Sequence, residues 1–220
     1  MLKGKKLSIL GDSVSTYKGV SNDMNANKSL FYNPYFHWYQ EPFPLDCTYW
    51  KRVIDAFGFE LCVNNSWSGG NLSGMNDENS GVNRAKELAR DDGASPDIVI
   101  VFMGLNDLGR RVDPFCFAED YKRTLEIIKD KYHPLCVCCV NLPDRDYRMK
   151  EETERFNNII KKASDDMGKG FFIADLFNSR LNNDVYYDNT VDGLHPDHDG
   201  MKVIAEVIEN AIRENVKTLI

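Results

Sequence analysis

Four short segments of this sequence carry the residue types that acyl transfer requires. Ser13 ends the tripeptide GDS at 11–13, and Asn106 lies in GLND at 104–107. Asp192 and His195 stand three positions apart in DGLHP at 192–196, and Gly69 lies in a glycine-rich stretch that follows Asn64. A serine hydroxyl attacks a carbonyl when an imidazole takes its proton, and a carboxylate holds that imidazole in the required tautomer. Amide and backbone N–H groups can then stabilise the oxyanion.

Each segment also has a purely structural reading. Asp12, Ser13, Ser15 and Thr16 are all good helix N-caps, and the tripeptide taken alone favours capping over catalysis. An asparagine just after a strand usually turns the chain, and glycines with polar neighbours usually make a turn. None of the segments decides the function by itself.

The stretch HPDHD at 195–199 could also suggest a metal site, because it holds two histidines and two aspartates, with Asp192 as a third aspartate just before it. All of these ligands would be local in the sequence, and no second ligand group is evident, so no metal is expected. Asp197 and Asp199 are better explained by the favourable dipole at a helix N-terminus.

The elements that must position these segments alternate between strands and helices. Short apolar runs bounded by Gly, Pro, Asn or Asp predict buried strands. They lie at 7–10, 60–63, 97–103, 135–140 and 170–174. Apolar residues at helical spacing predict five helices. These lie at 49–57, 82–90 and 115–131, around 156–163 and around 204–212.

This alternation predicts an α/β fold, with a parallel sheet covered by helices on both faces. Right-handed crossovers place every strand-to-helix loop at one edge of the sheet. The residues that follow the first, second, third and fifth strands should therefore meet at one rim. Together they supply a nucleophile, a base, an orienting carboxylate and oxyanion donors.

One aromatic-rich insertion, at about 17–48, is too long for an ordinary βα loop. It is either a packed excursion over the core or a lid or aromatic wall over the site, and the two readings are compatible. Trp38 and Tyr39 within it, and Trp67 after the second strand, are the candidate substrate contacts. Arg145 and Arg148, after the fourth strand, either contact a charged substrate or are solvated surface side chains, which is the more common case.

Size and composition indicate one soluble domain spanning 1–220. The net charge is −7 and the basic residues are scattered, so a nucleic-acid partner is not expected. No run approaches the roughly 20 apolar residues of a membrane span. The N-terminus lacks the apolar core of a signal peptide, which indicates a cytoplasmic protein unless a leader has been removed. The six cysteines show no metal-site spacing and are read as buried, reduced thiols.

Taken together, the motifs resemble the GDSL/SGNH hydrolase family over nearly the whole chain. That family carries Gly-Asp-Ser near the N-terminus, a glycine after the second strand, Gly-x-Asn-Asp after the third, and Asp-x-x-His-Pro near the C-terminus. The second motif is the loosest, since Gly70 could replace Gly69. Val14 stands where the family's short name has leucine, a position without a chemical role. The Gly-x-Ser-x-Gly elbow of α/β-hydrolases is absent.

The resemblance implies a flavodoxin-like three-layer α/β/α fold with a five-stranded parallel sheet. It implies Ser13 as nucleophile, His195 as base and Asp192 as its orienter. The N–H groups of Ser13 and Gly69 and the Asn106 amide would form the oxyanion hole, with no cofactor and no metal.

The implied function is serine-dependent hydrolysis of a small-molecule ester. The aromatic insertion favours a carbohydrate-ester deacetylase acting on an acetylated sugar. The alternatives are a lysophospholipase or thioesterase-type acyl hydrolase, and a catalytically silent carbohydrate-binding protein on the same fold. Oligomeric state is left open.

Overall fold

The computed structural model describes residues 2–20 and 43–217. Trp38, Tyr39 and most of the aromatic-rich insertion lie outside these residues. At the two ends of the insertion, Tyr17 and Phe43 are buried, and the Tyr17 hydroxyl donates to the Phe43 carbonyl at 3.0 Å. No helix in the described ranges is long and apolar enough to cross a membrane.

Five parallel strands form one sheet in the order β2-β1-β3-β4-β5. This is the flavodoxin-like order, and it confirms the predicted fold class. The strands are β1 (Lys6–Gly11), β2 (Glu60–Ser66), β3 (Ile98–Phe102), β4 (Cys136–Val140) and β5 (Phe171–Ala174). The sequences IVIVF of β3 and CVCCV of β4 are buried throughout, as expected for central strands covered on both faces.

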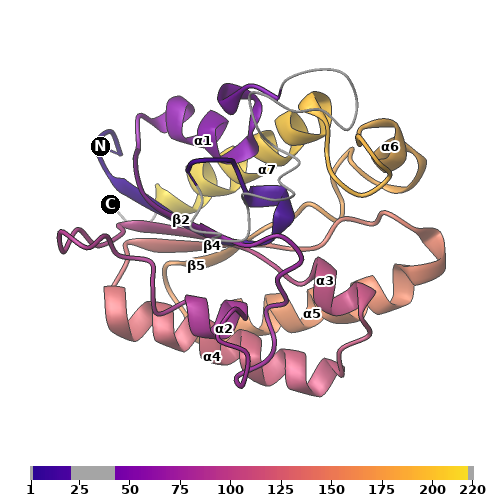
Figure 1. The fold of residues 1–220 in the computed structure, drawn as a ribbon, viewed down its shortest axis with the longest axis horizontal. Coiled ribbons are helices and arrows are strands. Elements are labelled where there is room, and N and C mark those ends of the chain that lie inside the picture. The colour runs from indigo at the N-terminus through magenta and orange to yellow at the C-terminus, as the bar shows by residue number, and fades with distance from the viewer. Residues whose placement is uncertain (1, 21–42, 218–220) are drawn as a thin grey trace.

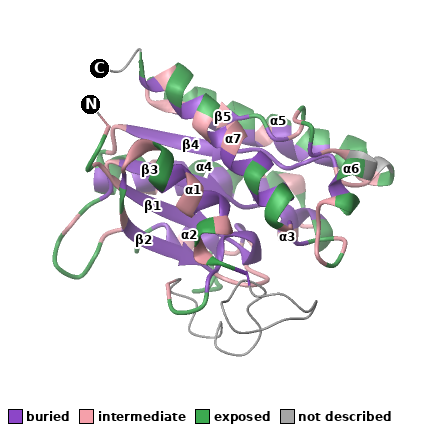
Figure 2. Ribbon diagram, turned by 90° about the horizontal axis from the view of Figure 1, so that it is seen from above, coloured by how far each residue is buried: buried purple, intermediate pink, exposed green. Residues whose placement is uncertain are grey.

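Helices cover both faces of the sheet (Figure 1). Helices α1 (Tyr49–Phe57) and α7 (His198–Val216) lie on one face, and α2 (Gly81–Arg84), α4 (Pro114–Tyr132) and α5 (Lys150–Met167) lie on the other. The short helices α3 (Leu105–Gly109) and α6 (Asn183–Asp188) lie at the edge where the strands end. In the view of Figure 2, buried residues fill the strands and the inner faces of the helices.

The predicted helix at 82–90 is wrong in length. Helix α2 ends at Arg84, and side chains from distant elements bind the residues that follow. Asn65 donates to the carbonyls of Arg84 and Glu87, each at 3.2 Å. The Leu88 N–H donates to the Tyr132 hydroxyl at 2.9 Å, and the Leu88 carbonyl accepts from Ser8 at 2.7 Å. These long-range bonds satisfy backbone groups that a continued helix would have paired.

Helix α7 is anchored to the loop that precedes it. Asp197 is its N-cap and accepts from the N–H groups of Asp199 and Gly200, as the dipole reading predicted. Gly200 lies so close to this loop that a Cβ there would stand 2.5 Å from the Asn189 carbonyl oxygen and 2.9 Å from Pro196 Cβ.

We therefore expect Gly200→Ala to lower the free energy of unfolding by about 1–3 kcal/mol, because the new methyl group meets backbone that cannot move aside. The same substitution in an exposed helix normally stabilises by up to about 1 kcal/mol. Gly109→Ala in α3 is the control, since a Cβ there meets nothing closer than Arg145 Nη2 at 3.9 Å. Urea denaturation of both variants checks the sign. An unfolding free energy for Gly200→Ala at or above that of the parent protein would contradict this packing argument.

Candidate active site

The serine and histidine segments meet at the edge where the strands end. Ser13 Oγ lies 2.9 Å from His195 Nε2, and His195 Nδ1 lies 2.8 Å from Asp192 Oδ2. Ser13 and His195 are both buried, whereas the Asp192 side chain is 21% exposed. Ser13 thus joins Asp192 and His195, from a loop 182 positions later in the chain, in one hydrogen-bonded series. Its catalytic role stays a prediction.

Ser13 occupies a short 3₁₀ helix (Ser13–Ser15) that follows β1 directly. Asp12 is the N-cap of this helix and accepts from the Val14 N–H at 3.0 Å. The Thr16 hydroxyl donates to the Ser13 carbonyl at 2.8 Å. The capping reading of this segment is therefore right for Asp12, and the cap leaves the Ser13 hydroxyl directed at His195.

Gly11 is needed for space, not for backbone freedom. Its φ is not positive, so the turn does not need glycine's conformational freedom. Instead, a Cβ at Gly11 would stand 2.4 Å from Ser15 Oγ and 2.7 Å from Ser66 Oγ. Glycine is required here because two side chains approach the backbone closely.

Asp192 and His195 form a compact unit within one loop. Besides its contact with the ring, the Asp192 carboxylate accepts from the backbone N–H of His195 at 2.7 Å and of Leu194 at 3.0 Å. The Val191 N–H donates to the His195 carbonyl at 2.8 Å, and the Tyr186 hydroxyl donates to the Leu194 carbonyl at 2.7 Å. The imidazole orientation is therefore set by short-range backbone geometry.

The electrostatics of this pair suit a neutral imidazole beside an ionised carboxylate. Burial lowers the pKa of His195 below its ordinary value, and this effect outweighs the opposing influence of Asp192. Burial tends to raise the pKa of Asp192, but hydrogen bonds from the His195 backbone and ring hold it below its usual range. At neutral pH, Nε2 can accept the Ser13 proton.

The candidate oxyanion donors are Asn106, in the first turn of α3, and Gly69, in the loop after β2. Asn106 Nδ2 donates to the Gly70 carbonyl at 3.0 Å and lies 3.5 Å from Asp12 Oδ2. Gly69 has a φ of +71°, a conformation that favours glycine. Among the described residues, the N–H of Gly69 finds no acceptor, whereas the Gly70 N–H donates to the Trp67 carbonyl at 3.1 Å. This contrast favours Gly69 over Gly70 as a donor.

The Trp67 backbone N–H donates to the Gly11 carbonyl at 3.3 Å, so this residue lies beside the serine loop. A substrate contact by its indole ring stays a prediction.

The sequence reasoning missed a buried cation beneath these loops. Arg84 is 2% exposed. Its guanidinium donates to the carbonyls of Asn65 at 2.6 Å, Asn79 at 2.8 Å and Gly11 at 3.1 Å, and lies 3.5 Å from Met103 Sδ. The only signal was an arginine within the apolar face shared by Val82, Ala85 and Leu88.

Two buried carboxylates complete the framework. Asp107 accepts from the N–H groups of Leu72 at 2.7 Å and Ser73 at 2.9 Å, which ties α3 to the glycine-rich loop. Burial raises the pKa of Asp12 to about 6, against the hydrogen bond from Val14 and the charge of Arg84.

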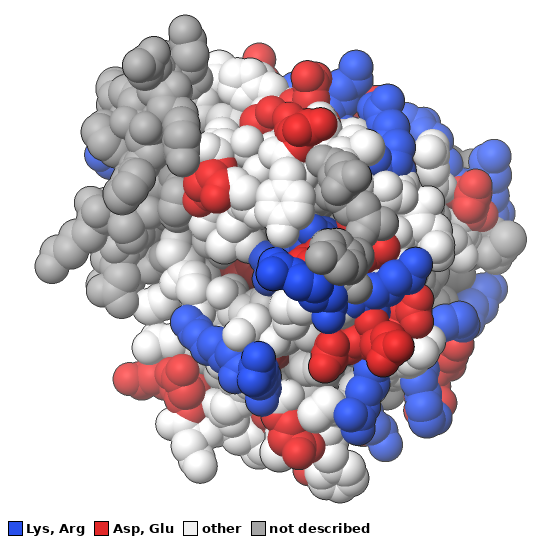
Figure 3. All heavy atoms as spheres, turned by 90° about the vertical axis from the view of Figure 1, so that its right-hand side faces the viewer, with Lys and Arg blue, Asp and Glu red and all other residues white. Residues whose placement is uncertain are grey.

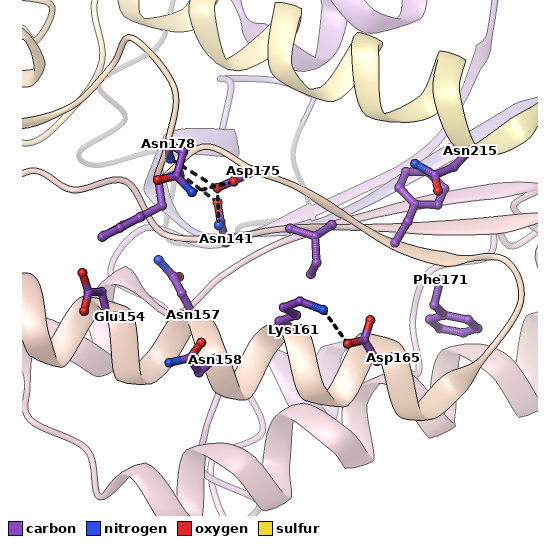
Figure 4. Close-up of a pocket in the computed structure, with 13 residues that line it drawn as sticks. Asn141, Glu154, Asn157, Asn158, Lys161, Asp165, Phe171, Asp175, Asn178 and Asn215 are labelled. Carbon is purple, nitrogen blue, oxygen red and sulfur yellow. Dashed lines mark hydrogen bonds and ion pairs between the residues drawn. The ribbon is translucent and has the colours of Figure 1, made fainter.

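One hollow among the described residues lies apart from this site. A hollow of about 700 Å³ lies at the β5 edge, and its described lining omits Ser13, Asp192 and His195 (Figure 4). Several amides around it are occupied by the chain itself. Asn141 donates to Asp175 at 2.8 Å and accepts from the N–H groups of Leu176 and Phe177. These bonds fix the ends of β4 and β5, which is a structural role.

The pH dependence of ester hydrolysis tests the state of His195. Lowering the pH through its folded-state pKa protonates Nε2, which can then no longer accept the Ser13 proton. We expect kcat/KM for a neutral ester to fall about tenfold per pH unit on the acid side, with a midpoint below about 6.5. Asp12→Asn is the control, because Asp12 also titrates in this range. If the acid-side fall of kcat/KM disappeared in Asp12→Asn, or if its midpoint lay above 6.5, the titrating group would not be His195.

Replacing Arg84 tests whether its buried hydrogen bonds stabilise the loops around Ser13. Arg84→Met removes the donors to three carbonyls and the charge beside Asp12, so we expect a loss of about 3–5 kcal/mol in unfolding free energy. Arg180→Met, at an exposed ion pair with Glu206, should lose less than about 1 kcal/mol. If chemical denaturation gave equal losses of unfolding free energy for the two variants, the buried hydrogen bonds of Arg84 would not stabilise these loops more than a surface ion pair does.

Comparison with known proteins agrees with the motifs. The profile of the GDSL-like lipase/acylhydrolase family matches residues 9–203. No curated protein sequence is significantly similar to the chain.

Solved structures share the fold. A protein from Bacteroides ovatus ATCC 8483 described as a GDSL-like lipase superposes with a TM-score of 0.73 at 23% identity, covering 96% of this chain and 99% of that one. The esterase EstA from Pseudoalteromonas sp. gives 0.63 at 15% identity, with coverages of 97% and 99%. A carbohydrate esterase family 2 enzyme from Corynascus thermopiles gives 0.64 at 18% identity, with coverages of 97% and 67%.

Proposed function

The chain belongs to the GDSL-like lipase/acylhydrolase family, and we propose that it hydrolyses carboxylic esters through an acyl-enzyme on Ser13. The observation that carries the proposal is the hydrogen-bonded series Ser13–His195–Asp192, with contacts of 2.9 and 2.8 Å. A nucleophile within reach of a base that is itself oriented by a carboxylate is the arrangement that acyl transfer needs.

The proposed reaction has two halves. Ser13 Oγ attacks the ester carbonyl while His195 Nε2 takes its proton, and the Asp192 carboxylate stabilises the imidazolium. The tetrahedral intermediate collapses, the alcohol leaves with the proton from His195, and Ser13 carries the acyl group. Water then attacks the acyl-enzyme as His195 takes its proton. The second tetrahedral intermediate collapses, His195 returns the proton to Ser13 Oγ, and the acid is released.

The oxyanion is proposed to accept from the N–H groups of Ser13 and Gly69 and from the Asn106 amide. One amide hydrogen of Asn106 is used by the Gly70 carbonyl at 3.0 Å, which fixes the side chain. The other points towards Asp12 across a long 3.5 Å contact, so a substrate oxygen can compete for it at little cost. This supports Asn106 as a donor that is oriented before substrate binds.

For the substrate, we propose an acylated sugar, with carbohydrate-ester deacetylation as the reaction. The aromatic residues of the insertion at about 17–48 support this choice, because aromatic rings stack on sugar rings. One neighbour with the same fold is a carbohydrate esterase. Lysophospholipid or thioester hydrolysis is the alternative, and a panel of acetylated sugars, acyl-chain lengths and thioesters separates them.

We expect the purified protein to cleave p-nitrophenyl acetate in the presence of a chelator, since the mechanism uses no metal. Ser13→Ala and His195→Ala should each lower kcat by at least about 10³-fold, because each removes a group that acts in both halves of the reaction. Circular dichroism should show an intact fold.

Ser15→Ala is the matched control. Ser15 lies two residues from Ser13 in the same 3₁₀ helix, but its hydroxyl pairs with the Tyr49 hydroxyl at 2.7 Å. Its turnover should stay within about threefold of the parent protein. If Ser13→Ala kept parent-level turnover, another nucleophile would have to be sought.

A further inference from the structure

Arg145 lies in the loop after β4, and the parallel strands place this loop at the same edge of the sheet as Ser13, which follows β1. The start of this loop is rigidly held. Asn157 accepts from the Leu142 N–H at 2.7 Å and donates to the Leu142 carbonyl at 2.9 Å. Asn141, one residue earlier, is bound to the loop after β5. Arg145 is therefore presented from a fixed backbone and is itself half-buried.

The charge of Arg145 is left without a counterion in its own loop. Asp146 pairs with Arg148 at 2.8 Å, and Asp144 lies 3.9 Å from Lys150. Across residues 2–20 and 43–217, Arg145 forms no ion pair and donates no hydrogen bond. A half-buried guanidinium gains from an anionic partner, because its five N–H groups are otherwise incompletely bound.

The guanidinium lies beside the candidate active site. Arg145 Nη2 is 3.9 Å from the position of a Cβ on Gly109, the last residue of the helix that carries Asn106. Burial dominates the pKa shifts of His195 and Asp12, and the positive charge of Arg145 lowers the pKa of both. The cation is therefore close enough to act on the base and on the cap of the serine loop.

Arg110 supplies a second cation nearby. Its Nη1 donates to Asn71 Oδ1 at 2.7 Å, and its Nη2 is 3.4 Å from the position of a Cβ on Gly69. The Asn71 contact holds this guanidinium over the glycine-rich loop. On the side of the molecule that Figure 3 shows, basic side chains gather near the middle, with acidic ones beside them.

We propose that Arg145, assisted by Arg110, forms an anion subsite beside Ser13, and that the ester substrate carries a carboxylate, phosphate or sulfate group. This proposal rests on the proposed function of Ser13. A guanidinium binds such groups through paired N–H bonds. An acylated sugar that bears one of these groups would satisfy both proposals.

Two pairs of esters test the subsite, each pair differing by one negative charge. The first is 4-acetoxybenzoate and its methyl ester, which carry the charge on the alcohol half. The second is 4-nitrophenyl hydrogen succinate and its methyl ester, which carry it on the acyl half. In at least one pair, Arg145→Gln should lower the ratio of kcat/KM for the charged over the neutral ester by about 10- to 100-fold.

Matched variants separate recognition from general charge. Arg145→Lys should keep part of the preference, and Arg110→Gln should lose part of it. Arg148→Gln removes the same charge from the same loop, at a side chain tied to Asp146, and should change the ratio less than about twofold. Intrinsic reactivities of the two esters cancel, because the ratio is compared between variants.

The outcomes distinguish the two proposals. If Arg145→Gln shifts the pH profile of both esters equally and leaves both ratios unchanged, Arg145 acts only as a charge on His195, and the subsite is wrong while Ser13 keeps its role. If no ester is hydrolysed, or Ser13→Ala equals the parent, the proposed function fails. Calorimetric binding of 4-acetoxybenzoate and of 4-nitrophenyl hydrogen succinate to Ser13→Ala tests the subsite independently of turnover. Adding Arg145→Gln should weaken at least one of the two by about 10-fold or more, and unchanged binding of both overturns the subsite.

Discussion

A buried cation that must be fully hydrogen-bonded organises this edge of the molecule. The guanidinium of Arg84 has no water to bind, so its N–H groups need acceptors from the protein itself. It finds them in the carbonyls of Gly11, Asn65 and Asn79. These carbonyls belong to the ends of β1 and β2 and to the loop after β2. Satisfying one arginine therefore fixes where the serine loop and the glycine-rich loop stand relative to each other.

Structural and catalytic readings of the motifs turn out to be compatible rather than exclusive. Asp12 caps the short helix that begins at Ser13, and the same carboxylate lies 3.5 Å from the Asn106 amide. Asp107, next to Asn106, binds backbone N–H groups of the glycine-rich loop. In each motif, one residue holds a loop and its neighbour faces the reaction centre. The two roles fall on neighbouring residues because a side chain at the end of a strand can be positioned only where the backbone beside it is anchored.

The strands and long helices could be predicted because they leave strong local periodicity, and their alternation placed Ser13 and His195 at one edge of the sheet. The flavodoxin-like sheet was expected only from the family resemblance. The end of α2 at Arg84 could not be predicted, since it depends on hydrogen bonds with the side chains of Asn65 and Tyr132 that no local pattern encodes. For the same reason, Arg145 could not be told from a solvated arginine. Within the described residues Arg145 forms no ion pair, while Asp146 and Asp144 pair with Arg148 and Lys150, and only the folded arrangement reveals this.

The Asp192–His195 unit closes within three residues, whereas the hydrogen bond from His195 to Ser13 spans 182 positions of the chain. The first contact is available to a local loop at almost any stage of folding. The second forms only when the first strand and the start of the last helix have docked onto the same sheet. Under the proposed mechanism, turnover is then an assay of completed topology: a molecule in which either end of the chain has detached keeps the Asp192–His195 contact and loses the contact with Ser13.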